Sequence, residues 1–421
     1  MQPFLLNANK RGVVRKTASA CRSIFGCHRY RNILAVAVDA RTELWEDPLW
    51  EVPQSRLVTK KLYLVGGDVL YFPDILLGVL SPSKQVKLSH LLFGKPLFLV
   101  PTMAAIGNRG TVTEASGFDP EADVQKLREA MKGVGTDEAA VIDVLAHRTI
   151  AQRQRIKEAF KQAVGKDLAG ELNTELSGNF RSVVLGLLML APVYDAYELR
   201  NAMKGAGTEE ACLIDILASR TNDEIKAICA FYKKEYGNLE KDVCGDTSGM
   251  FQRVLVSLLT AGRDEGDKVD EALAAQDAKE IYEAGEARWG TDEVKFLTVL
   301  CVRNRNHLLR VFEEYKKISG REIEDSIKRE MSGCLEDAFL AIVKCMRSKP
   351  AFFAERLYKS MKGLGTTDSI LIRIMVSRAE IDMLDIKAEF LKMYGKTLHS
   401  FIKGDTSGDY RKILLELCGG E

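Results

Sequence analysis

The sequence predicts an all-α protein in which four similar units, each of about five short helices, follow an N-terminal segment of different character. A two-point motif recurs four times after residue 118, and self-similarity at a regular spacing is the signature of a repeat architecture. Within each copy the apolar residues recur at helical spacing, and no alternating strand pattern appears after residue 103.

The motif consists of a glycine loop and an acid that follows it about 40 residues later. The loops are Met131-Lys-Gly-Val-Gly-Thr136, Met203-Lys-Gly-Ala-Gly-Thr208, the shortened Ala287-Arg-Trp-Gly-Thr291 and Met361-Lys-Gly-Leu-Gly-Thr366. The acids stand in Glu175-Leu-Ser-Gly178, Asp246-Thr-Ser-Gly249, Glu330-Met-Ser-Gly333 and Asp405-Thr-Ser-Gly408. From the last glycine of each loop to its acid the distances are 40, 39, 40 and 40 residues. We place the repeats at 119–191, 192–260, 261–348 and 349–421, after a tail at 103–118.

The first unit shows how a repeat begins. Asp119 and Pro120 predict an N-cap and a first helical residue. Val124, Leu127 and Met131 then follow at the spacing of one helix face. A first helix therefore runs up to the glycine loop.

The remaining helices of a unit are predicted by their boundary residues. The glycine loop ends the first helix, and Thr136-Asp-Glu opens the second, with acids where the helix dipole favours them. Thr149-Ile-Ala-Gln152 and Thr221-Asn-Asp-Glu224 fit the capping box that starts a third helix. The last element, Phe180 to Ala191, is apolar nearly all round and too short to span a bilayer, so we expect a central core helix.

The overall charge excludes a general nucleic-acid binder. Lys plus Arg is 60 and Asp plus Glu is 59, which gives a net charge of +1. Any anionic partner must therefore be reached through a local device, such as a metal ion or a helix terminus.

Residues 1–102 form a basic, proline-containing extension that we leave without a fold and expect to be irregular. They hold 14 of the Lys and Arg residues but only 7 acids, and seven of the ten prolines. We interpret them as the product of an alternative start, with the native chain beginning at Met103; intact mass tests this. Residues 1–38 lack acids, which is weakly typical of a mitochondrial transit peptide, and no apolar run reaches the length of a membrane span.

The chemistry of the motif favours calcium. A Gly-x-Gly loop at a helix end exposes carbonyl oxygens that have no intrahelical partner, and a returning carboxylate adds a further pair. Such an all-oxygen shell suits Ca²⁺, whereas Zn²⁺ prefers Cys or His. The alternative is that the glycines are helix C-caps, the acids are N-caps of the last helix, and the two never meet. Four copies of the paired spacing favour the metal site.

These loops, the Asp-Thr-Ser-Gly segments and the terminal Lys403-Gly-Asp-Thr-Ser-Gly-Asp-Tyr-Arg411 resemble the annexin family over residues 118–418. The resemblance implies four repeats of five helices packed as a curved disc, with Ca²⁺-dependent binding to acidic phospholipids such as phosphatidylserine. Carried over by position, the metal ligands would be Met131, Gly133, Gly135 and Glu175; Met203, Gly205, Gly207 and Asp246; Gly285, Arg288, Gly290 and Glu330; and Met361, Gly363, Gly365 and Asp405.

The sequence departs from the family pattern at three places. Tyr236-Gly-Asn-Leu239 is one residue short, which accounts for the spacing of 39. In the third loop Arg288-Trp289 replaces the first glycine. In the fourth, Thr366-Thr-Asp368 stands where the other loops continue with two acids.

Three further predictions follow from single positions. Trp289 would contact the membrane, because tryptophan favours the interface; the alternative is packing on its own repeat. The resemblance also implies ion pairs of Asp195 with Arg220 and of Asp215 with Arg373, which we expect to join repeats rather than carry ions.

We therefore expect a non-enzymatic, Ca²⁺-dependent phospholipid-binding protein, since no paired nucleophile and base is present. Its role would lie in membrane organisation, vesicle aggregation or exocytosis. It would be cytoplasmic, peripheral on membranes when Ca²⁺ rises, and compatible with a nuclear pool. We expect lateral self-association on membranes and no nucleic-acid partner. The alternative function is an α-helical scaffold that binds protein partners without calcium.

Overall fold

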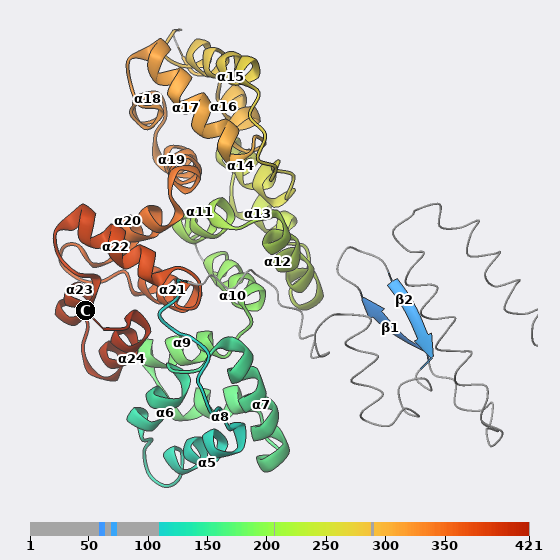
Figure 1. Ribbon diagram of the computed structural model, residues 1–421, viewed down its shortest axis with the longest axis vertical. Coiled ribbons are helices and arrows are strands. Elements are labelled where there is room, and N and C mark those ends of the chain that lie inside the picture. The colour runs from blue at the N-terminus through green and yellow to red at the C-terminus, as the bar shows by residue number, and fades with distance from the viewer. Residues whose placement is uncertain (1–58, 64–68, 74–108, 206, 288–289, 421) are drawn as a thin grey trace, which may run out of the picture. The chain divides into compact units, whose positions relative to one another are not determined.

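The computed structural model describes residues 59–63, 69–73, 109–205, 207–287 and 290–420. The chain divides into two compact units, Met1–Leu99 and Val100–Glu421. The described helices lie in the second unit (Figure 1).

The described helices of residues 109–420 number twenty, five in each repeat, so the predicted all-α fold is confirmed. Repeat 1 contains α5 (Pro120–Ala130), α6 (Glu138–Leu145), α7 (Ile150–Val164), α8 (Leu168–Glu175) and α9 (Gly178–Leu187). Repeat 2 contains α10 (Ala191–Ala202), α11 (Glu210–Ser219), α12 (Asn222–Glu235), α13 (Leu239–Asp246) and α14 (Gly249–Leu259). Repeat 3 contains α15 (Glu271–Ala284), α16 (Glu293–Leu300), α17 (Arg305–Ser319), α18 (Ile323–Glu330) and α19 (Gly333–Arg347). Repeat 4 contains α20 (Lys349–Met361), α21 (Asp368–Arg378), α22 (Met383–Tyr394), α23 (Leu398–Asp405) and α24 (Gly408–Cys418).

The predicted helix starts are confirmed where capping chemistry is local. Asp119 accepts hydrogen bonds from the backbone of α5, whose first turn holds Pro120. Thr149 and Thr221 both form complete capping boxes, with Gln152 and Glu224 respectively. Each cap satisfies backbone N–H groups that the first helical turn leaves without partners.

Two predicted boundaries were wrong. The last helix of repeat 1 ends at Leu187 rather than Ala191, because Leu190 caps α10 and Pro192 stands in its first turn. Proline there cannot continue a preceding helix, since its ring would clash with the carbonyl four residues earlier. The second helix is capped by Asp137 rather than by Thr136.

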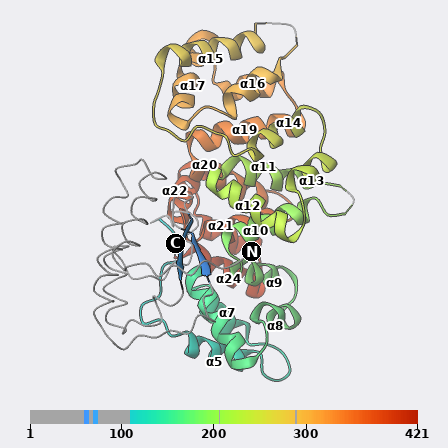
Figure 2. The ribbon, with the colours of Figure 1, turned by 90° about the vertical axis from the view of Figure 1, so that its right-hand side faces the viewer.

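The fifth helix of each repeat supplies the core, as expected from its apolar sequence. In α19 the side chains of Phe339, Ile342 and Val343 are completely buried. Figures 1 and 2 both show α9 of repeat 1 against α21 and α24 of repeat 4, and α11 of repeat 2 against α19 of repeat 3. The fifth helices therefore hold neighbouring repeats together as well as their own.

The tail at residues 109–118 connects repeat 1 to repeat 4. The backbone N–H of Thr111 donates to Ala379 O at 2.8 Å, and its hydroxyl donates to Leu417 O. Gly110 passes so close to Glu380 that an added Cβ would lie 2.5 Å from its backbone. Only glycine fits at this crossing.

In the first unit, the described residues form two strands, β1 (Thr59–Tyr63) and β2 (Val69–Pro73). They pair antiparallel with Thr59 opposite Pro73. This hairpin departs from the irregular structure expected for the extension, and its threonine, tyrosine, valine and phenylalanine residues are typical of strands. The rest of residues 1–102, and Met103, lie outside the described residues.

Candidate metal sites in the four loops

A loop with the same closing bond follows the first helix of every repeat. In repeats 1, 2 and 4 the residue after the threonine donates its N–H to a carbonyl in the last turn of that helix, at 2.7 to 2.9 Å. The donors are Asp137, Glu209 and Thr367, and the acceptors are Ala130, Ala202 and Ser360. The bond holds the chain between them in a compact loop.

Two glycines in each of these three loops make the turn. Gly133 and Gly135 have φ of +108° and +88°, values that residues with a Cβ rarely adopt. Their counterparts Gly205, Gly207, Gly363 and Gly365 lie between +89° and +114°. Nothing lies within 4 Å of the space that a Cβ would occupy at any of these glycines, so their special conformation serves the turn and not close packing.

The distant acid meets the loop in all four repeats. Thr136 Oγ1 donates to Glu175 Oε2 at 3.4 Å, and Thr208 Oγ1 donates to Asp246 Oδ2 at 3.3 Å. Thr291 Oγ1 donates to Glu330 Oε2 at 3.2 Å, and Thr366 Oγ1 donates to Asp405 Oδ2. The alternative in which loop and acid never meet is therefore wrong. The acids also do not cap the fifth helices, whose N-caps are serines.

Each acid is the last residue of the fourth helix of its repeat. A helix C-terminus carries partial negative charge, so a carboxylate there is unfavourable by about 0.3–1 kcal/mol. Among the described residues, none of these four carboxylates forms an ion pair with lysine or arginine. A cation bound beside each carboxylate would offset the unfavourable helix dipole and supply the positive partner that the carboxylate lacks.

The donor set fits a hard cation. No group of three or more His, Cys, Asp or Glu side chains able to hold a metal occurs in the part of the chain that is described. The groups that each loop and its distant acid bring together are backbone carbonyls, a carboxylate and the threonine hydroxyl. Those are the oxygen ligands that Ca²⁺ accepts in flexible geometry, and they lack the nitrogen and sulfur that Zn²⁺ prefers.

The third loop is built differently. Its closing bond runs from Asp292 N to Ala284 O, so it is one residue longer than the others and not shortened, as its motif suggested. Gly285, which stands where Met131 stands in repeat 1, has a φ of −118°, and Gly290 keeps the positive φ of the last loop glycine, at +83°. Glu286 is held by Arg321 Nη1 at 2.9 Å and by Ser326 Oγ at 2.6 Å. The predicted ligand Arg288 and the predicted membrane contact Trp289 lie outside the described residues.

The missing residue of repeat 2 is absorbed far from its loop. Helix α12 has 14 residues where α7 has 15. The chain then turns toward α13 through Gly237, which has a φ of +113°. The bond between Thr208 and Asp246 is kept. In repeat 4 the departure is Thr367, which stands in place of the first acid and still donates the closing bond to Ser360 O. The acid after it, Asp368, accepts a hydrogen bond from Tyr410 at 2.9 Å.

The structure brings together both pairs of charged residues that the resemblance implies. Arg220 donates two hydrogen bonds to Asp195, at 2.7 and 2.9 Å. Arg373 Nη2 lies 2.8 Å from Asp215, which also pairs with Arg356. Asp215 lies in repeat 2 and its partners in repeat 4, so this pair joins two repeats, as expected. Asp195 and Arg220 both lie in repeat 2, so the expectation that this pair joins repeats was wrong.

The sequence reasoning missed that the Asp195 pair has equivalents. Arg148 donates two hydrogen bonds to Asp123, 25 residues before it, and Arg303 donates two to Asp277, 26 residues before it. In repeat 4 the aspartate position holds Phe353. Arg378 lies over that ring at 4.8 Å and pairs with Asp382 instead. The nearly constant spacing of 25 or 26 residues between aspartate and arginine would have predicted these equivalent pairs from the sequence.

The loop threonines were also missed as site residues, although each was part of the motif. A second missed feature is the residue between the paired glycines. The side chains of Val134 and Leu364 are completely exposed, at 109% each. Such apolar side chains at loop tips make no packing contact within the fold.

Among the described residues, no helix is long and apolar enough to cross a membrane. The annexin family model matches residues 122–187, 194–258, 276–342 and 352–417. Annexin A4 of Mus musculus is 67% identical over 313 residues, which are 74% of this chain and 98% of the relative. Annexin A11 of Oryctolagus cuniculus is 58% identical over 315 residues, 75% of this chain and 63% of the relative. The structure of chicken annexin V in complex with Zn²⁺ aligns with a TM-score of 0.72 at 54% identity, over 75% of this chain and 100% of that one.

Proposed function

The chain belongs to the annexin family, and we propose that it docks reversibly on acidic membranes through Ca²⁺ ions held between its loops and lipid phosphates. Annexins bind Ca²⁺ and, in its presence, phospholipids, and this chain shares both properties. We propose that named residues of the four loops hold the ions and contact the membrane.

Each ion would be held by loop carbonyls and the carboxylate of its own repeat. In repeat 1 these are the carbonyls of Met131, Gly133 and Gly135 with Glu175. In repeats 2 and 4 they are Met203, Gly205, Gly207 and Asp246, and Met361, Gly363, Gly365 and Asp405. In repeat 3 they are Gly285, Arg288, Gly290 and Glu330. The observation that carries the proposal is the threonine hydroxyl bonded to the acid in every repeat.

The charge balance explains why lipid is needed. One carboxylate neutralises only half the charge of Ca²⁺, so each ion keeps a positive charge and open coordination positions. A lipid phosphate supplies both a negative charge and hard oxygen ligands. Protein and phosphate would then share the ion, and binding would reverse when Ca²⁺ is removed.

The loop tips would add an apolar contribution. Val134 and Leu364 are completely exposed beside the proposed ions, and burying a valine or leucine side chain stabilises by about 1.5–3 kcal/mol. Trp289 would act in the same way in repeat 3. Because several loops would engage one surface together, weak individual contacts would add to a strong attachment. Lateral self-association and a role in membrane organisation, vesicle aggregation or exocytosis would follow from that attachment.

The test is co-sedimentation with phosphatidylserine vesicles, in Ca²⁺ and then in EGTA. The variant Glu175→Ala with Asp405→Ala should need at least tenfold more Ca²⁺ for half-maximal pelleting. Glu158→Ala with Glu389→Ala removes one exposed and one half-buried acid from the third helices of the same repeats, away from the loops, and should behave as wild type. Equal pelleting in Ca²⁺ and EGTA would exclude the ion bridge. Unchanged binding by the first variant would favour the calcium-independent scaffold.

A further inference from the structure

A pocket of about 660 Å³ lies where repeats 1, 2 and 4 meet, and no candidate loop residue lines it. Its walls come from the starts of α7, α10, α12 and α20 and from the end of α21. Sites for small organic molecules typically have volumes of about 300–1,000 Å³. The pocket therefore has the size of a ligand site.

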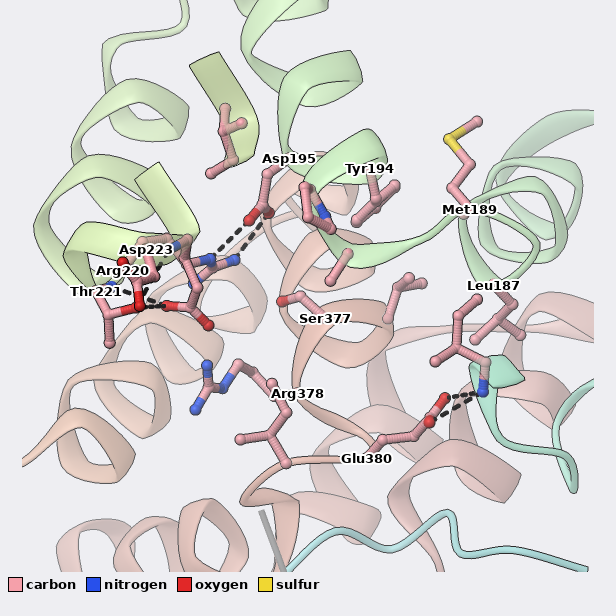
Figure 3. Close-up of a pocket in the computed structure, with 18 of the residues that line it drawn as sticks. Leu187, Met189, Tyr194, Asp195, Arg220, Thr221, Asp223, Ser377, Arg378 and Glu380 are labelled. Atoms are coloured by element: carbon pink, nitrogen blue, oxygen red, sulfur yellow. Dashed lines mark hydrogen bonds and ion pairs between the residues drawn. The ribbon is translucent and has the colours of Figure 1, made fainter. Parts of the chain in front are cut away.

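One side of the pocket is apolar. Leu187, Met189, Pro192 and Val376 line it, and in the view of Figure 3 Leu187 and Met189 lie on the opposite side from Arg220 and Thr221. An apolar group placed here would leave water on binding, which is favourable in proportion to the area removed.

Most charged groups of the pocket are already paired. Asp195 accepts both of its hydrogen bonds from Arg220 (Figure 3). Glu380 accepts from the backbone N–H of Ile150 at 2.9 and 3.0 Å and from Arg153 Nη1 at 3.0 Å. Glu224 accepts through Oε2 in the capping box of α12. The acids of the pocket are therefore largely occupied by the protein itself.

Several hydrogen-bond donors of the pocket remain without a partner. Two of them are completely buried, Arg153 Nη2 and the Tyr194 hydroxyl, and three more come from repeat 4. Among the described residues, the Lys349 ammonium makes no ion pair or hydrogen bond, and neither does the hydroxyl of Ser377. Arg378 uses Nε and Nη2 on Asp382, which leaves Nη1 available. Lys349 is also the first residue of α20, where the helix dipole adds positive potential. Burial lowers the pKa of the Lys349 ammonium; nearby Arg378 and Arg220 act in the same direction, while Glu224 opposes them.

We propose that this pocket binds a small organic anion with an apolar body, such as an aryl or acyl carboxylate, sulfonate or phosphate monoester. The anionic group would lie against Lys349, Ser377 and Arg378, and the apolar body against Leu187 and Met189. Because the walls come from three repeats, the ligand would stabilise their junction. This site is independent of Ca²⁺ and of the membrane loops.

The experiment uses 8-anilino-1-naphthalenesulfonate as the probe, with the full chain in EGTA and without lipid. Fluorescence titration should saturate at one probe per chain and raise the melting temperature. Lys349→Met should weaken binding at least tenfold. Ser377→Phe fills the pocket without removing any hydrogen bond that the described residues make, and should abolish binding. The matched control Lys392→Met removes an exposed lysine of α22 and should bind as wild type.

The uncharged analogue N-phenyl-1-naphthylamine should bind at least tenfold more weakly, and inorganic phosphate should not compete at equal concentration. Wild-type affinity in Ser377→Phe would place the probe elsewhere and overturn the proposal. Unchanged affinity in Lys349→Met, or equal affinity for the uncharged analogue, would show that the pocket does not recognise the anion. Competition by phosphate as strong as by the probe would show that the apolar body is not required.

Discussion

Replacing the two exposed loop-tip side chains tests how the protein would hold a membrane once Ca²⁺ is bound. The double variant Val134→Ser with Leu364→Ser leaves every proposed metal ligand in place, since the ligands at these loops are neighbouring carbonyls and a distant acid. Both side chains are completely exposed, so their removal should change the free energy of unfolding by less than about 0.5 kcal/mol.

The expected loss of membrane affinity follows from the apolar area. Complete burial of valine or leucine is worth about 1.5–3 kcal/mol each. Side chains that enter only the interfacial region would realise about half of this, so the pair would contribute about 1.5–3 kcal/mol. At about 1.4 kcal/mol per factor of ten, vesicle binding should weaken roughly 10- to 150-fold.

The assay is a titration with vesicles of phosphatidylserine and phosphatidylcholine at one saturating Ca²⁺ concentration. Leu391→Ser is the matched control, because it removes an exposed leucine from α22 and not from a loop. The control should bind as wild type. If the double variant also binds as wild type, the loop tips do not enter the membrane, and attachment through the ions alone would have to be accepted.

Three further variants test the loop, an ion pair and a half-buried acid. Thr366→Val removes the hydroxyl that holds Asp405, so the Ca²⁺ needed for half-maximal vesicle binding should rise about threefold, whereas Thr298→Val on α16 should leave it unchanged. Asp195→Ala leaves Arg220 buried without its partner and should lower the free energy of unfolding in urea by about 3–5 kcal/mol; an effect as small as that of exposed Asp223→Ala would refute this. Burial raises the pKa of Glu198 to about 7 from its ordinary value of 4.5, against the opposing charge of Arg373. The unfolded chain then loses this proton first as the pH rises, so wild type should lose about 2 kcal/mol of stability relative to Glu198→Gln between pH 5 and 7.5; parallel curves for the two proteins would contradict it.

Features that depend on near neighbours in the chain were predicted well. The capping boxes at Thr149 and Thr221, the N-cap at Asp119 and the ends of the first helices at the glycine loops all involve residues within four positions of one another. Their energies act inside a single turn, so the local sequence is enough to place them. The end of α9 was predicted wrongly because the next helix, α10, takes the same residues from Leu190 onward. The other wrong boundary is a shift of one residue, from Thr136 to the N-cap Asp137.

The candidate site was predicted only in part. Four copies of one spacing indicated that loop and acid belong together, but the spacing does not show which atoms meet. Thr136 was read as the start of a helix, whereas its hydroxyl binds Glu175 across 39 residues. The third loop was misjudged because its length depends on which carbonyl Asp292 reaches, and that is set by the packing of α15 against α16.

The amino-acid sequence by itself determined the number of repeats and the helices within them, and it predicted oxygen ligands rather than nitrogen and sulfur. Periodicity and caps are short-range, and an ion's preference for oxygen depends only on residue type. The tertiary structure decided which distant groups come together. Asp215 meets Arg373 across 158 residues, Phe353 takes the place of an aspartate in the fourth repeat, and three repeats enclose one pocket. These arrangements depend on how neighbouring repeats pack, and the pattern within a single repeat carries no information about that packing.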